Sequence, residues 1–90
     1  MSFEWDEDKA GANLEKHGVS FEEAQTVFDD PLYVDFYDIG HSYGEHRYII
    51  LGASNQGRLL LVSYTERGDN IRLISSREAV PAERRAYEEH

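Results

Sequence analysis

The first 31 residues contain two stretches in which apolar positions recur at helical spacing. Residues 5–18 begin with Asp6, a residue type that caps helices, and acids follow it in the first turn, where negative charge is favourable. Gly18 then suits the left-handed conformation in which many helices end. The pattern therefore predicts a helix that ends at about His17. Its predicted buried face comprises Ala10, Leu14 and His17.

The second stretch, residues 19–31, carries its own helix start signal. Ser20 and Glu23 have the spacing of a capping box, in which each side chain bonds the backbone of the other residue. Pro31 disfavours helical backbone at the residue before it, so the helix should end by about Asp29. A tight helical hairpin is predicted for residues 6–29.

After Pro31 the apolar period changes from helical to alternating, which is typical of strands. Turns containing glycine separate four such segments, and short connections favour antiparallel pairing. The two central segments are the most apolar, so they should be the most buried. The predicted strands are residues 32–37, 47–54, 58–65 and 70–77.

The last segment, residues 80–90, has helical propensity, and Pro81 suits the first helical position although Val80 is a poor cap. The complete pattern predicts an α+β fold with two N-terminal helices, a four-stranded antiparallel sheet and a C-terminal helix. A chain of 90 residues supplies a single core, so residues 1–90 are expected to form one domain.

Cysteine is absent, and the acidic start does not resemble a signal peptide. No apolar run approaches the ~20 residues of a membrane span. A cytoplasmic protein with no membrane association is therefore expected.

Charge is divided unevenly along the chain. Residues 1–45 hold twelve acids and two lysines, a balance of −10, whereas residues 46–90 hold six acids and seven arginines, a balance of +1. An overall net charge of −9 argues against nucleic acid as a ligand, but the local balance does not. The acidic half suits a basic partner, and the arginine-bearing half remains suited to an anionic substrate.

Several kinds of catalytic site lack support in the sequence. His41 and His46 lie five residues apart in a predicted loop, which is not the spacing of a helical metal site. No serine lies on a nucleophile elbow, and no glycine-rich phosphate loop is present. Neither a metal ion nor another cofactor is expected.

The arginines form the most informative set. Guanidinium groups bind phosphate through paired charge-assisted hydrogen bonds, although a single arginine is more often a surface or ion-pair residue. Arg72 and Arg77 would lie on opposite faces of a regular strand, so their convergence requires either a bulge or a position at the end of the strand. The set comprises Arg47, Arg58, Arg67, Arg72, Arg77, Arg84 and Arg85.

His17 follows Lys16 at the predicted end of the first helix. A helix C-terminus favours the protonated imidazole, which suits a general acid. A purely structural role, in which His17 caps the helix and packs against strands, is the simpler alternative.

Three stretches carry a resemblance to a known family. The segment "FEWDEDKAGANLEKHGVSFEEAQTVF" resembles the amino-terminal signature of the BrnT toxin family. "TERGDNIRLISSREA", followed by "ERRAYE", resembles its carboxyl signature, and "GEHRYIILGAS" and "GRLLLVSYT" fit its central strands. The resemblance spans nearly the whole chain.

The resemblance implies the toxin half of a type II toxin-antitoxin pair, with a RelE-like fold. It also implies an endoribonuclease that arrests growth, and a BrnA-like antitoxin that neutralises it by direct contact in a hetero-oligomer. RNA would be the substrate, and DNA would be contacted only through the antitoxin.

Metal-independent RNA cleavage needs a base, an acid and cations around the phosphate. Our hypothesis is that Arg67, Arg72 and Arg77 stabilise the phosphate with a contribution from Arg47. The residues expected to bind RNA are Arg47, Arg84 and Arg85. The candidates for proton transfer are His17, Lys16, Tyr64 and Glu66. The alternative is a non-catalytic module whose arginines bind an antitoxin-like partner in a transcriptional autoregulation complex.

Overall fold

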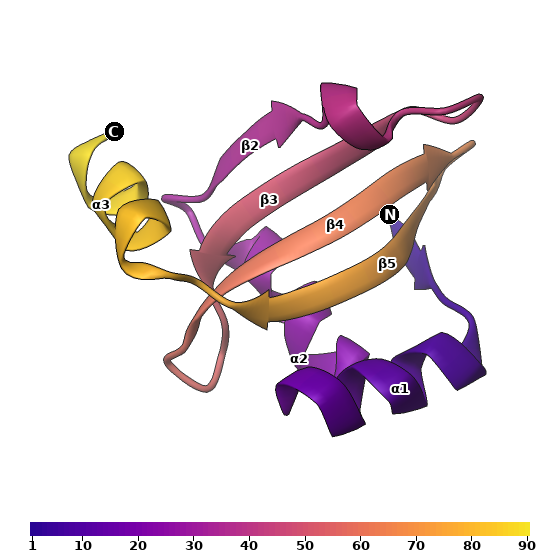
Figure 1. The fold of residues 1–90 in the computed structure, drawn as a ribbon, viewed down its shortest axis with the longest axis horizontal. Helices are drawn as coiled ribbons and strands as arrows, with labels where there is room; N and C mark the ends of the chain where they lie inside the picture. The colour runs from indigo at the N-terminus through magenta and orange to yellow at the C-terminus, as the bar shows by residue number, and fades with distance from the viewer.

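The computed structural model describes all 90 residues as one mixed sheet with helices on both sides (Figure 1). The strands are β1 (Ser2–Glu4), β2 (Val34–Tyr37), β3 (Arg47–Ala53), β4 (Leu59–Arg67) and β5 (Asn70–Glu78). The α-helices are α1 (Glu7–His17), α2 (Phe21–Ala24) and α3 (Pro81–Glu89), and the 3-10 helices are η1 (Gln25–Asp29) and η2 (Ile39–His41).

The α+β class is confirmed, but the predicted four-stranded antiparallel sheet is wrong. The sheet has five strands in the order β1-β5-β4-β3-β2, and β1 pairs with β5 in parallel. A strand of three residues is too short to display alternation, so the sequence pattern did not reveal β1. The β2-β3-β4-β5 meander matches the predicted order.

Helix α1 has the predicted caps, and two residues of its predicted buried face, Ala10 and His17, are half-buried. The Asp6 side chain accepts hydrogen bonds from the backbone at Asp8 and Lys9, and Gly18 has a left-handed φ of 68°. Leu14, however, is 52% exposed, whereas Asn13 is only 7% exposed. On this short helix, polar contacts to β5 therefore decide more than apolar periodicity which side chain is buried.

The second predicted helix is mostly not α-helical. Only residues 21–24 form α2, and the chain continues as η1 to Asp29. Ser20 accepts a hydrogen bond from the Glu23 backbone as predicted, but the Glu23 carboxylate binds Arg58 and Ser54 instead of returning to Ser20. Half of the capping box is therefore formed.

Two apolar clusters cover opposite faces of the sheet, because neighbouring residues on a strand point to opposite sides. Leu60 and Val62 pack with Val19, Phe21 and other residues beneath α2 and η1. On the other face a smaller cluster of Leu51, Leu59 and Leu61 contacts Ala79 and Tyr87 near α3. Helix α3 covers only part of this second face, so a stretch of it stays open.

Gly52 allows η1 to approach the sheet closely. A Cβ atom at this position would lie 2.9 Å from a Val27 methyl carbon and 3.1 Å from Asp30 Oδ2. This close approach lets the Asp30 carboxylate accept hydrogen bonds from the Ala53 backbone N–H at 2.8 Å and from the Tyr87 hydroxyl at 2.5 Å. The Asp30 carboxylate thus fixes α3 against the end of β3.

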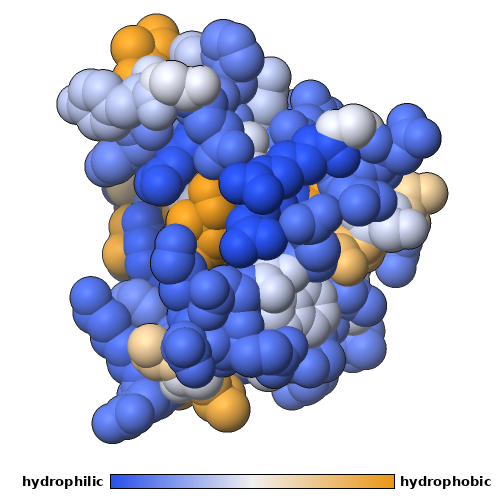
Figure 2. Space-filling model, turned by 90° about the vertical axis from the view of Figure 1, so that its right-hand side faces the viewer, coloured by the Kyte–Doolittle hydropathy of each residue, from blue (hydrophilic) through white to orange (hydrophobic).

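One side of the molecule is strongly hydrophilic (Figure 2), in keeping with the acidic composition. The side of the molecule that faces right in Figure 1 shows apolar atoms only in small patches between hydrophilic side chains (Figure 2). No helix has the length and apolar character needed to cross a membrane.

Candidate functional site

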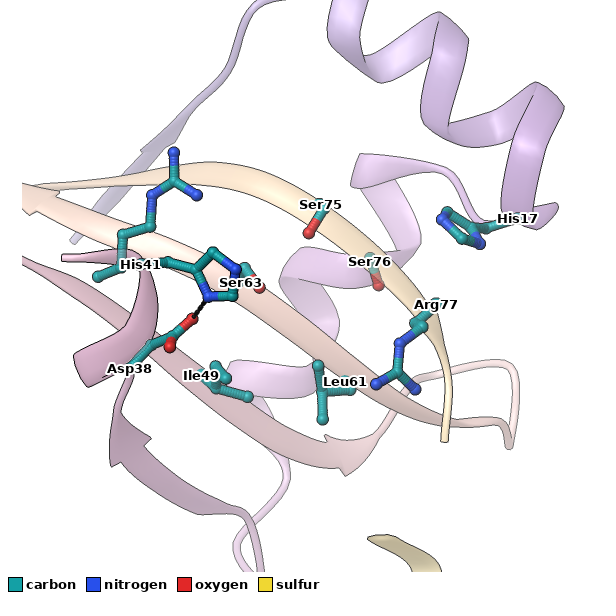
Figure 3. A pocket seen from close by; sticks show the side chains of 10 residues that line it. His17, Asp38, His41, Ile49, Leu61, Ser63, Ser75, Ser76 and Arg77 are labelled. Carbon is teal, nitrogen blue, oxygen red and sulfur yellow. Dashed lines mark hydrogen bonds and ion pairs between the residues drawn. The ribbon is translucent and has the colours of Figure 1, made fainter. Parts of the chain in front are cut away.

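A cavity of about 350 Å³ lies on the open part of the sheet face beside α3. Apolar side chains of Ile49 and Leu61 lie on its floor, and polar side chains from β3, β4, β5, η2 and the end of α1 surround them (Figure 3). The polar lining residues are His17, Asp38, His41, Arg47, Ser63, Ser75, Ser76 and Arg77.

A β-bulge turns Arg77 towards this cavity. Ser63 pairs with Ser75 while the next residue of β4, Tyr64, pairs with Leu73, so Ile74 is an extra residue in β5. Arg72 and Arg77 consequently lie opposite Thr65 and Leu61, which share one face of β4. Of the two conditions under which these arginines could converge, the bulge is therefore the one present.

Asn13 of α1 holds the backbone beside the bulge. Its side-chain amide donates to the carbonyl oxygens of Ser76 and Val19, both at 2.9 Å, and its oxygen accepts from the Ser76 N–H at 3.0 Å. These buried contacts fix the position of Arg77, the next residue. The Ser76 hydroxyl itself is buried without a hydrogen-bond partner.

Arg77 is held in a bidentate ion pair. Its two terminal nitrogens each donate to one oxygen of Glu83 in α3, both at 2.8 Å. These hydrogen bonds lower the pKa of Glu83 and raise that of Arg77. Glu83 also accepts the Val80 N–H at 2.9 Å, so it supplies the cap that Val80 cannot. The Glu83 carboxylate occupies the guanidinium fork in the manner expected of a phosphate.

His41 and Asp38 form a dyad at the mouth of the cavity. His41 Nδ1 lies 2.9 Å from Asp38 Oδ2, and Figure 3 shows this contact with the ring directed towards Ser63. A carboxylate accepts hydrogen bonds, so Nδ1 carries the proton and Nε2 is left as an acceptor when the ring is neutral. The dyad is thus suited to take a proton from a ligand in the cavity.

Arg47 lines the cavity without an acidic partner. The other strand arginines, Arg67, Arg72 and Arg77, each form an ion pair, whereas Arg47 forms none. Its backbone N–H donates to Ser42 Oγ at 3.0 Å, and that hydroxyl donates to the Asp38 carbonyl at 2.6 Å. These bonds tie η2 to the start of β3 and place the dyad beside a free guanidinium.

Residues 5–83 match the family model described as "Ribonuclease toxin, BrnT, of type II toxin-antitoxin system". The chain belongs to the BrnT toxin family. The resemblance inferred from the sequence motifs is thereby confirmed, and membership of a type II toxin family implies an antitoxin partner.

A solved structure supports the fold of this BrnT-family chain. The crystal structure of the Brucella abortus ribonuclease toxin BrnT matches with a TM-score of 0.69 and 24% sequence identity. The match covers 89% of this chain and 97% of that one. Among curated proteins, none matches the chain significantly.

The fold places only some of the predicted site residues at the cavity. His17, Arg47 and Arg77 line it, and Lys16 lines an adjoining hollow that shares His17 and Ser75 with it. Arg67 instead pairs with Glu45 at 3.3 Å, and Arg72 pairs with Glu4 at 2.9 Å. The latter pair joins β5 to β1.

The remaining predicted residues lie elsewhere. Tyr64 is buried in an aromatic stack with Tyr48, and its burial, with smaller effects of nearby acids, raises its pKa to about 12. Glu66 is exposed near the β4–β5 turn, and Arg84 and Arg85 are exposed on α3. Neither Tyr64 nor Glu66 lines the cavity.

Sequence patterns missed the Asp38–His41 dyad and the serines of the cavity. His41 was interpreted as a solvated loop residue because nothing in the local sequence marks a three-residue 3-10 helix. The Asp-x-x-His spacing is the one signal that could have suggested the contact, since residues three apart in a helical turn are neighbours. Nowhere do three or more His, Asp or Glu side chains gather in a way that would hold a metal ion.

Proposed function

We propose that this chain is an endoribonuclease toxin that cleaves RNA in the cavity on the open sheet face, without a metal ion. One observation carries the proposal. Two arginines and two histidines from four different elements, Arg47, Arg77, His17 and His41, line a single cavity in a chain of a ribonuclease toxin family. These side-chain types supply the cations and proton-transfer groups that phosphodiester cleavage requires.

The reaction is transesterification within the RNA strand. A base removes the proton of a 2′-hydroxyl, and the resulting oxygen attacks the adjacent phosphorus. The bond from phosphorus to the 5′-oxygen breaks, and an acid protonates that leaving oxygen. The products are a 2′,3′-cyclic phosphate and a free 5′-hydroxyl.

His41 is the better placed base and His17 the corresponding acid. The Asp38 carboxylate orients His41 and stabilises the charge that the ring gains on accepting a proton. His17 ends α1 and lines the same cavity from the side of that helix. Lys16, in the adjoining hollow, is the alternative acid.

Arg47 and Arg77 stabilise the extra negative charge of the pentavalent phosphorus. Arg77 can bind the phosphate only after its hydrogen bonds to Glu83 break, because both of its terminal nitrogens donate to that carboxylate. Arg84 and Arg85, exposed on α3, contact RNA beyond the cavity. Arg67 and Arg72 act indirectly, through their ion pairs with Glu45 and Glu4, and Tyr64 acts through its place in the core. Glu66, which is exposed outside the cavity, has no part in the reaction.

The wider assignment follows the family. The antitoxin is of the BrnA kind, binds the toxin directly in a hetero-oligomer and contacts DNA through its own domain. The chain acts in the cytoplasm as one RelE-like domain over residues 1–90.

A second candidate function has one observation in its favour. Three of the arginines assigned to phosphate are already paired, Arg67 with Glu45, Arg72 with Glu4 and Arg77 with Glu83. A non-catalytic module that binds an antitoxin-like partner and helps to repress transcription would need no free phosphate site. Arg47, which has no acidic partner, favours the nuclease.

Inducing the chain alone in bacteria, and mapping RNA ends, separates the two functions. The nuclease arrests growth and produces new ends, and His41→Ala or Arg77→Ala abolishes both effects while the protein stays folded. His46→Ala, which removes an exposed histidine outside the cavity, should leave the arrest unchanged. Normal growth with intact RNA in the wild type would favour the module.

A further inference from the structure

Strand β2 lies at the border of the sheet with one side unpaired. It pairs only with β3, and Figure 1 shows no element along its outer side. The Asp38 N–H donates to the Arg47 carbonyl, and bonded pairs alternate along an antiparallel ladder. Phe36 therefore bonds to β3, whereas the backbone groups of Asp35 and Tyr37 point away from it. These outward groups can pair with a further strand.

Exposed apolar side chains concentrate beside this border. Residues 32–43, termed here the β2 edge, hold six of the nine large apolar side chains that are exposed in the whole chain. Ile39 is 81% exposed and Tyr43 is 86% exposed. Native edge strands are usually protected by lysine, proline or a covering element, and the β2 edge has none of these. Such a concentration is typical of an interaction surface. The six residues are Leu32, Tyr33, Phe36, Tyr37, Ile39 and Tyr43.

The charge around the β2 edge has one sign. Residues 29–45 contain five acids and no lysine or arginine. Asp30, Asp38 and Glu45 have partners within the chain, but the side chains of Asp29 and Asp35 form no ion pair or hydrogen bond. A basic partner therefore gains ion pairs here. A second copy does not, because pairing two β2 edges would bring Asp35 towards like charge and join two chains of net charge −9.

The β2 edge also runs directly into the candidate active site. Helix η2 follows β2 after one residue, Asp38, and both Asp38 and His41 of η2 line the cavity. A strand that pairs with β2 and continues past Tyr37 would lie beside His41. Occupation of the edge can thus limit access of RNA to the dyad.

We propose that the β2 edge is the docking site for a basic, extended segment of the partner protein, which adds a strand to the sheet next to β2. Backbone hydrogen bonds provide affinity in this mode, and alternating apolar and basic side chains provide specificity. The assignment of this segment to the antitoxin rests on the proposed function. Docking at the β2 edge does not depend on whether the chain cleaves RNA.

The test uses the intact chain labelled for NMR and a short synthetic peptide in which lysine and valine alternate, without RNA. Amide signals of residues 32–43 should shift, and the N–H groups of Asp35 and Tyr37 should become protected from hydrogen exchange. A peptide with glutamate in place of lysine should not bind. Sedimentation of the free chain should show a monomer.

Two substitutions at Asp35 separate charge from backbone pairing. Asp35→Asn removes only the charge, whereas Asp35→Pro also removes the outward N–H, and proline is tolerated where an edge N–H does not face its neighbour. Asp35→Pro should weaken peptide binding by a further factor of about five to ten, the effect of one lost hydrogen bond. Glu15→Gln, which removes an exposed acid on α1 away from the β2 edge, is the charge control and should bind as tightly as the wild type. If Asp35→Pro fails to fold, Asp35→Lys replaces it and should abolish binding.

Three results would overturn the docking site: shifts centred outside residues 32–43, equal binding of the Asp35→Pro and wild-type chains, or a dimer formed through β2. Failure of RNA cleavage with intact peptide binding would count against the nuclease alone. Cleavage without peptide binding would count against the docking site alone.

Discussion

Replacing Asn13 by alanine tests how α1 positions the part of β5 that lies between the bulge at Ile74 and Arg77. In the folded protein the Asn13 amide makes three buried hydrogen bonds, two to Ser76 and one to Val19. Truncation leaves one N–H and two carbonyl groups without these partners. A methyl group cannot replace any of them, and the site is 7% exposed, so water has little access.

The expected loss of unfolding free energy is large for a small domain. Each buried polar group left unpaired costs about 1–3 kcal/mol, but the three losses are not additive, and we expect about 3 kcal/mol in total. For a domain of this size, that corresponds to a fall in Tm of about 12–24 °C. Leu14→Ala is the matched control, because Leu14 is 52% exposed. It should change stability by about 0.5 kcal/mol or less.

Urea and thermal unfolding followed by circular dichroism measure both variants. The apolar periodicity of α1 alone would predict the opposite order, with Leu14→Ala the more damaging. Equal or greater destabilisation by Leu14→Ala would therefore refute the assignment of Asn13 as the residue that joins α1 to β5.

Three further predictions concern other contacts. Glu83→Gln should strengthen binding of a short RNA by a factor of about 2–5, because a partly exposed ion pair contributes about 0.2–1 kcal/mol. Glu88→Gln, which changes an exposed acid on the same helix, should not strengthen RNA binding. Fluorescence anisotropy measures the binding of both variants. Gly52→Ala should destabilise the fold by about 1–3 kcal/mol, because the new methyl group would collide with Val27. Gly11→Ala should instead stabilise the fold by about 0.5–1 kcal/mol, because its new Cβ would meet nothing within 4 Å. The same unfolding assay measures both variants. Hydrogen bonds from arginines lower the pKa values of Glu4, Glu23 and Glu83. The folded state therefore binds fewer protons than the unfolded state as the pH falls. Urea titrations should show a free energy of unfolding that is constant above about pH 5 and decreases below about pH 4.

Local signals in the sequence predicted much of the fold. Asp6 and Gly18 mark the ends of α1, the turn at residues 55–57 joins the two most buried strands, and Pro81 begins α3. Each of these features depends on a residue type with a strong backbone preference, so it can be recognised without tertiary information.

Features that depend on contacts between distant residues were not predictable. Strand β1 forms because Phe3 pairs with Ile71, which is far away in the sequence. Asn13 is buried because its side chain hydrogen-bonds the backbone of Ser76, which is equally distant in the sequence. The sequence indicated the bulge at Ile74 only as one of two ways in which the arginines could converge.

The candidate site was predictable only in part, for the same reason. Residue type and family resemblance singled out His17, Arg47 and Arg77. The Asp38–His41 dyad depends on a 3-10 turn and on its packing beside β3, which no pattern in the sequence indicates.

Cleavage of a defined RNA by the purified chain, in the presence of a metal chelator, tests the central claim most directly. The wild type and His46→Ala should produce fragments ending in a 2′,3′-cyclic phosphate. Arg77→Ala and His41→Ala should cleave at least about a hundredfold more slowly, as expected for loss of a group that stabilises the transition state or transfers a proton. Undiminished cleavage by both variants, or cleavage that requires a metal ion, would contradict the assignment of the cavity as the catalytic site.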